Sequence, residues 1–196
     1  MIGRPGPRQR RAVFFLLAIS VFAISYYVGN RNKTDNVSPI SGVVMRPPTP
    51  APEFQLFDQS NEPFSQQQLL GSWNLLVLDP QSGTASPAFH RMVQVYNRLA
   101  IELELQRQTR FIYVPRESSD DIKAGADRLG PNFIALHGTE QDLDETFSRF
   151  GVSDITDSFT LYLIDPEARI HALFTDVQDA ATIAADLKAI ISNQNP

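Results

Sequence analysis

The chain of 196 residues contains no cysteine. A protein without cysteine has no disulfide framework, no thiolate metal ligand and no thiol redox chemistry. Histidine is scarce as well, because only three are present and they are scattered without the spacing of a metal site. These absences exclude the sulfur-based classes of function before any motif is considered.

Negative charge outweighs positive charge after the N-terminus. The net charge is −5, yet residues 1–29 contain four arginines and no acidic residue, so the rest of the chain carries a net charge of −9. Nucleic-acid-binding domains need a basic face for the phosphates. The acidic remainder therefore argues against nucleic acid as a partner, while 42% hydrophobic residues suffice for a core.

Residues 12–28, AVFFLLAISVFAISYYV, form an uncharged apolar stretch. About 17–25 such residues span a bilayer. The arginine-rich residues 1–11 favour a cytoplasmic tip. We therefore expect a single-pass anchor in a bacterial inner membrane, with the N-terminus inside and the following domain in the periplasm. The alternative is a cleaved signal peptide, since Ala23 and Ser25 are small residues at a suitable spacing.

A change in composition separates the apolar stretch from the rest of the chain. Residues 29–52 are rich in asparagine, serine and proline, and end in RPPTPAP. Such segments favour an extended backbone. We expect a tether over residues 29–52, a folded domain over residues 53–192 and a short tail over residues 193–196.

Strand and helix patterns alternate along the expected domain. Apolar residues recur at helical spacing after Pro87, a residue favoured in the first turn of a helix, and Ser86 is the expected cap. The expected elements are strands at 54–57, 74–78, 111–114, 133–136, 161–164 and 170–174, and helices at 66–70, 87–108, 119–129, 139–150 and 177–191.

This order predicts an α/β fold, a three-layer sandwich of the thioredoxin type with a central mixed sheet. In thioredoxin-like domains, the junction between the central strand and the next helix usually carries a pair of cysteines. Here the junction reads SGTASP over residues 82–87, with serine at both candidate positions. The sequence therefore predicts the fold, but serine replaces the two cysteines that usually react at this junction.

Four segments resemble the Sco/SenC family of membrane-anchored, thioredoxin-fold proteins that help assemble the copper centre of cytochrome c oxidase. They are residues 71–76 (GSWNLL), 94–99 (QVYNRL), 133–139 (FIALHGT) and 161–166 (LYLIDP). The resemblance covers residues 52–191 and rests on the shared order of these segments, together with the expected anchor and tether.

The family binds copper through two cysteines in Cys-x-x-x-Cys-Pro and one histidine before the hairpin strand. The resemblance places Ser82 and Ser86 on the cysteines and Asp157 on the histidine. Cu(I) selects soft sulfur ligands, and hydroxyl oxygens are poor substitutes. We therefore expect no copper site, no other metal site and no cofactor.

Two further groupings offer alternatives. Ser86 and His90 lie one helical turn apart, so Ser86, His90 and Asp157 are a candidate hydrolase triad, against the simpler reading of a capping serine and a surface histidine. The acidic residues Glu140, Asp142, Asp144 and Glu145 indicate a solvated helix face or a surface that attracts a basic partner.

The function expected from the resemblance is non-enzymatic. It is an accessory or scaffold role in cytochrome c oxidase biogenesis, with an oxidase subunit or assembly factor as the protein partner. Fold alone does not fix function, so a binding module for an unrelated envelope partner is the alternative, and a serine-dependent enzyme is the remote one.

Overall fold

A computed structural model describes residues 40–81, 83–117, 119–152 and 159–194. The expected basic tip and membrane anchor lie outside these residues, as do residues 195–196 of the expected tail. Within the described ranges, no helix is both long and apolar enough to cross a bilayer.

The sheet is mixed, as the sequence predicted, and has the strand order β1-β8-β7-β4-β5-β6. β4, β5 and β6 run parallel, whereas β7 is antiparallel to β4 and to β8. The strands are β1 (Val43–Pro50), β4 (Trp73–Asp79), β5 (Thr109–Pro115), β6 (Phe133–Ala135), β7 (Thr160–Ile164) and β8 (Arg169–Thr175).

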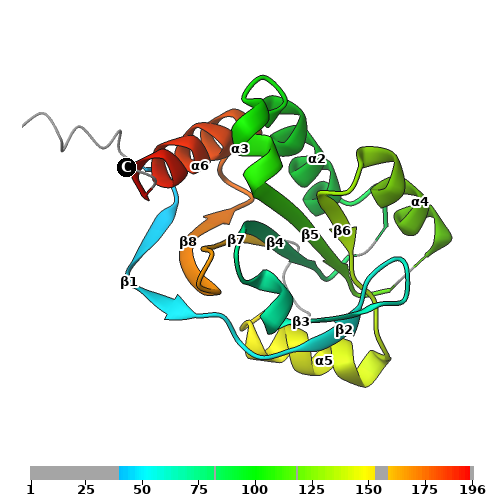
Figure 1. Cartoon of the computed structure of the whole chain (residues 1–196). Helices are drawn as coiled ribbons and strands as arrows, with labels where there is room; N and C mark the ends of the chain where they lie inside the picture. The colour runs from blue at the N-terminus through cyan, green and yellow to red at the C-terminus, as the bar shows by residue number, and fades with distance from the viewer. Residues whose placement is uncertain (1–39, 82, 118, 153–158, 195–196) are drawn as a thin grey trace, which may run out of the picture. The chain divides into compact units, whose positions relative to one another are not determined.

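Helices cover one face of this sheet, and a helix with a small hairpin covers the other (Figure 1). The hairpin and its 3-10 helix are β2 (Gln55–Phe57), β3 (Pro63–Ser65) and η2 (Gln66–Leu69). The helices are α2 (Pro87–Leu99), α3 (Leu103–Gln108), α4 (Asp120–Leu129), α5 (Glu140–Arg149) and α6 (Ala180–Gln194).

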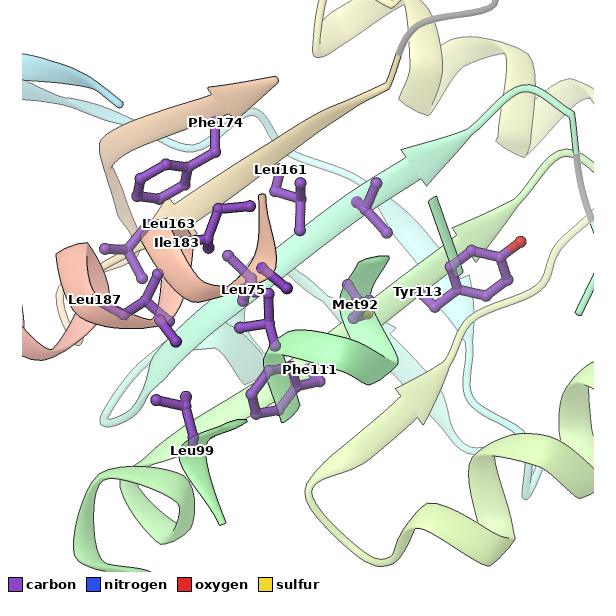
Figure 2. Close-up of a cluster of buried hydrophobic side chains, with 14 of the residues drawn as sticks. Leu75, Met92, Leu99, Phe111, Tyr113, Leu161, Leu163, Phe174, Ile183 and Leu187 are labelled. Carbon is purple, nitrogen blue, oxygen red and sulfur yellow. The ribbon is translucent and has the colours of Figure 1, made fainter. Parts of the chain in front are cut away.

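The alternation of side chains along each strand divides the core into two clusters. On one face, Leu75 and Phe111 pack against Met92 of α2 and Ile183 of α6 (Figure 2). On the other face, residues such as Leu76 pack against the hairpin and α5. The sheet is therefore buried on both sides, which explains why the sequence of β4 reads as a continuous apolar run.

The expected tether is wrong over part of its length. Val43–Pro50 forms the edge strand β1, antiparallel to β8. The prolines of this segment suggested an extended linker, but proline is also tolerated on an edge strand. Upstream of β1, the buried carboxylate of Asp186 accepts hydrogen bonds from the backbone N–H groups of Ser41 (2.7 Å) and Gly42 (3.3 Å). The domain therefore includes most of the proline-rich segment.

The helix expected over residues 87–108 is also wrong in one respect, because it is two helices. Hydrogen bonds that span three residues, from Ala100 N–H to the Asn97 carbonyl and from Glu102 N–H to the Leu99 carbonyl, end α2. Ile101 in the connecting turn is 88% exposed. The apolar spacing that predicted one helix continues through Leu103, which is 56% exposed and does not join the core.

Replacing Asp186 with alanine should destabilise the domain. The substitution leaves the two N–H groups upstream of β1 without an acceptor, which should cost about 1–3 kcal/mol of unfolding free energy. Denaturant unfolding measures the change. Asp176→Ala, at an exposed position between β8 and α6, is the matched control and should be nearly neutral. Equal stabilities for the two variants would contradict the docking of this segment.

Candidate functional site

The candidate site lies where β4 ends and α2 begins. Asp79 is the last residue of β4, Ser86 caps α2, and Tyr113 lies on the adjacent strand β5. The three residues are 2%, 4% and 0% exposed, respectively. The parallel pairing of β4 with β5 brings residues 34 positions apart to the same buried corner.

One carboxylate organises this corner. The hydroxyl groups of Ser86 and Tyr113 both donate to Oδ2 of Asp79, and the Tyr113 Oη to Oδ2 distance is 2.5 Å. The backbone N–H of Gln81 donates to Oδ1 at 3.0 Å. Ser86 Oγ in turn accepts the N–H of Phe89 at 3.0 Å, which is the expected helix cap. We call Asp79, Ser86 and Tyr113 the carboxylate network.

Burial and charge keep the Tyr113 hydroxyl of this network protonated. Burial raises the pKa of the Tyr113 phenol, and the negative charge of Asp79 raises it further. Tyr113 therefore remains a hydrogen-bond donor. Figure 2 shows its ring at the end of the apolar cluster with the hydroxyl pointing away from it. The carboxylate lies beside the first turn of α2, where the helix dipole favours a negative charge.

These contacts determine what the network can do chemically. The Ser86 hydroxyl donates a hydrogen bond to Asp79 and accepts one from the Phe89 N–H, so it is engaged both as a donor and as an acceptor. Being 4% exposed, it does not present a nucleophile to solvent. The donor set is oxygen only, which does not fit Cu(I). The arrangement is suited to holding β4, β5 and α2 together.

The structure describes only one of the three positions that the sequence matched to copper ligands. Ser86 is the cap of α2. Ser82 and Asp157 lie outside the described residues. Among the residues that are described, no group of three or more histidine, aspartate or glutamate side chains could hold a metal ion.

The candidate triad of Ser86, His90 and Asp157 gains no support. His90 is exposed, and its contact with Ser86 is the helical bond from its backbone N–H to the Ser86 carbonyl. The Ser86 hydroxyl turns to Asp79 instead. The side chain that could act on Ser86 is therefore a buried carboxylate rather than a histidine.

The acidic residues of α5 have several structural roles. Asp142 forms a capping box with Thr139, Asp144 pairs with Arg116 at 2.6 Å, and Glu145 pairs with Arg149 at 3.4 Å. A groove of about 500 Å³ lies between this helix and the β2–β3 hairpin, and Asp142, Glu145 and Arg149 are among the residues that line it. Three of the four acidic side chains therefore form a helix cap or an ion pair within the domain.

Sequence reasoning missed Asp79 and Tyr113. Asp79 ends the apolar strand, and Tyr113 alternates with residues that face the other side of the sheet. An acidic residue directly after a buried strand was a usable signal. Its partners were not evident, because the pairing with Tyr113 depends on the register of β5.

The family model for SCO1/SenC matches residues 46–192. The chain belongs to the SCO1/SenC family. As a SCO1/SenC protein without a single cysteine, it is a divergent member. No curated protein matches the sequence.

Solved structures show the same fold at low identity. Yeast Sco1 with copper bound is 16% identical with a TM-score of 0.61, over 74% of this chain and 94% of that chain. Sco1 from Thermus thermophilus is 20% identical with a TM-score of 0.56, over 76% and 95%. The peroxidoxin BcpB of Mycobacterium tuberculosis is 16% identical with a TM-score of 0.56, over 74% and 96%. These likenesses confirm the thioredoxin-like α/β fold.

Because Ser86 and Tyr113 share one carboxylate oxygen, their substitutions should be coupled. Ser86→Ala should cost about 0.5–2 kcal/mol of unfolding free energy, as for other helix caps, and Tyr113→Phe about 1.5–3 kcal/mol, as for a bond to a charged group. The double variant should depart from the sum by about 0.5–3 kcal/mol. Denaturant unfolding of the four proteins measures this coupling.

Tyr162 provides the control for this cycle. Its hydroxyl donates to the Phe150 carbonyl at 2.9 Å, and the residue belongs to the core cluster on the other face of the sheet. Tyr162→Phe combined with Ser86→Ala should therefore be additive. The shared-carboxylate account fails if both pairs show the same coupling.

Proposed function

We propose that the protein is a membrane-anchored, extracytoplasmic accessory or scaffold in cytochrome c oxidase biogenesis that does not bind copper. Family membership supports the assembly role: a relative from the same family, BsSco, is described as a member of the Sco family of cytochrome c oxidase assembly proteins. In this proposal, the chain keeps the family's fold and acts through its surface.

The observation that carries the proposal is the engagement of Ser86 in the carboxylate network. At a position matched to a copper-binding cysteine stands a buried hydroxyl whose hydrogen-bonding capacity is used within the domain. A serine whose hydroxyl makes these two hydrogen bonds stabilises the fold and is not available to bind copper. In this proposal, Ser82 and Asp157 do not bind copper either, because neither side chain is a soft ligand for Cu(I).

The anchor remains part of the proposal. The apolar residues 12–28 behind an arginine-rich tip favour insertion with the N-terminus inside the cytoplasm, which leaves the folded domain in the periplasm. A related SCO1/SenC protein from Bacillus anthracis is a lipoprotein. Attachment to the membrane would place this domain next to the membrane-embedded oxidase.

Gene deletion with complementation tests the proposed role. Deletion should lower cytochrome c oxidase activity, and the Ser86→Ala protein should restore it to the level of the natural chain, because the hydroxyl has a structural role only. Accumulation of the variant and its thermal stability are measured in parallel. A stable Ser86→Ala protein that fails to restore activity would make the hydroxyl a working group and overturn the scaffold role.

A surface variant completes this experiment. Glu140→Gln with Glu145→Gln neutralises two acidic residues of α5 and spares the helix-capping Asp142. If a basic partner docks on α5, this protein should restore less activity than Ser86→Ala. If deletion leaves the oxidase unchanged, the oxidase role is wrong and the alternative, a thioredoxin-fold binding module for another envelope partner, is favoured.

A further inference from the structure

Four buried side-chain atoms have no hydrogen-bond partner in the described ranges, and three of them belong to neighbouring residues. They are Nε and Nη2 of Arg110 and Oδ1 of Asn74. Asn74 on β4 is paired in register with Arg110 on the parallel strand β5. The two side chains therefore point to the same face of the sheet, the face that carries Leu76 and Ile112. Buried polar atoms left unpaired on two register partners of neighbouring strands require an explanation.

The arginine presents its strongest binding edge. Nε–H and Nη2–H project in parallel from one side of the guanidinium and match two oxygens of an oxoanion. Burial lowers the pKa of Arg110, and none of the ion pairs among the described residues involves its guanidinium. The positive charge is thus partly desolvated and has no counter-charge within the described part of the chain.

The orientation of the asparagine amide is fixed. Its Nδ2 donates to the carbonyl groups of Leu69 and Ser72, both at 2.8 Å. A flipped amide would place Oδ1 against two carbonyl oxygens, which repel it. Asn74 is fully buried, so Oδ1 is an acceptor without a donor. The two residues therefore offer two parallel donors on a cation and one acceptor on the same face of the neighbouring strand.

We propose that Arg110 and Asn74 bind a small oxoanion that carries one hydroxyl group, of the size and shape of bicarbonate. Two of its oxygens accept the hydrogen bonds from Nε and Nη2 of Arg110, and its hydroxyl donates to Oδ1 of Asn74. The charge of the anion compensates the guanidinium, and all three unpaired atoms become satisfied. A water molecule would supply hydrogen bonds without the charge.

The surroundings favour a small ligand. Leu69 at the end of η2, Ile112 on β5 and Ile164 on β7 are all 0% exposed, and Ile164 is the register partner of Asn74. A bulky ligand would have to displace these side chains. The site lies on the opposite face of the sheet from the cluster that contains Tyr113, so it is independent of the proposed scaffold role.

Nuclear magnetic resonance of the arginine side chains tests the proposal on the full chain in detergent micelles. The Nε–Hε resonance of Arg110, identified by its disappearance in Arg110→Lys or by through-bond assignment, is followed during titration with sodium bicarbonate at constant ionic strength. We expect a saturable shift. Acetate, which is planar but has no hydroxyl group, should bind about tenfold more weakly because the bond to Asn74 is lost.

Thermal unfolding supplies an independent reading. At ten times the dissociation constant, bicarbonate should raise the melting temperature by about 3 °C. Arg110→Lys should abolish this rise. Arg107→Lys, at an exposed position paired with Glu104, is the matched control and should keep it. The proposal is overturned if the Arg110 resonance does not respond to bicarbonate, because water alone would then satisfy the site. It is also overturned if chloride, phosphate and bicarbonate shift the resonance equally, because the response would then be a nonspecific effect of anions.

Discussion

The junction of β4, β5 and α2 depends on one buried carboxylate. Asp79 is taken out of water at the end of a central strand, and a charge in such a place is tolerated only when it is hydrogen-bonded. Two hydroxyls and a backbone N–H supply those bonds, and the N-terminus of α2 supplies a favourable dipole. The same Ser86 caps the helix, so strand, helix and neighbouring strand are joined through a few polar atoms.

This junction is also where thioredoxin-like proteins usually place their reactive cysteines. In this structure the junction contains a serine, Ser86, that has a structural role. Its hydroxyl and that of Tyr113 both donate hydrogen bonds to the buried Asp79 carboxylate. The substitution has a chemical consequence, since hard oxygens do not retain Cu(I) and a protonated serine exchanges no disulfide. We propose that this SCO1/SenC protein has kept the family's fold without binding copper.

Much of the fold follows from local patterns in the sequence. The apolar run of β4, the helical spacing after Pro87 and the hairpin after Ile164 predicted the central elements and the mixed sheet. Strand β1 was not predictable, because its proline-rich composition resembles a linker and its partner β8 is distant in sequence. The same limit applies to the site: the role of Ser86 as a helix cap was readable, whereas its bond to Asp79 and the approach of Tyr113 arise only from the pairing of strands.

Competition for Cu(I) is the most direct test of the central claim. The natural chain and a variant carrying Ser82→Cys, Ser86→Cys and Asp157→His are each loaded with Cu(I) and then exposed to a chelator of moderate affinity. The account predicts that the natural chain loses its copper to the chelator, and that copper retention rises in the variant if the scaffold geometry is preserved. Stoichiometric copper retained by the natural chain would contradict the account.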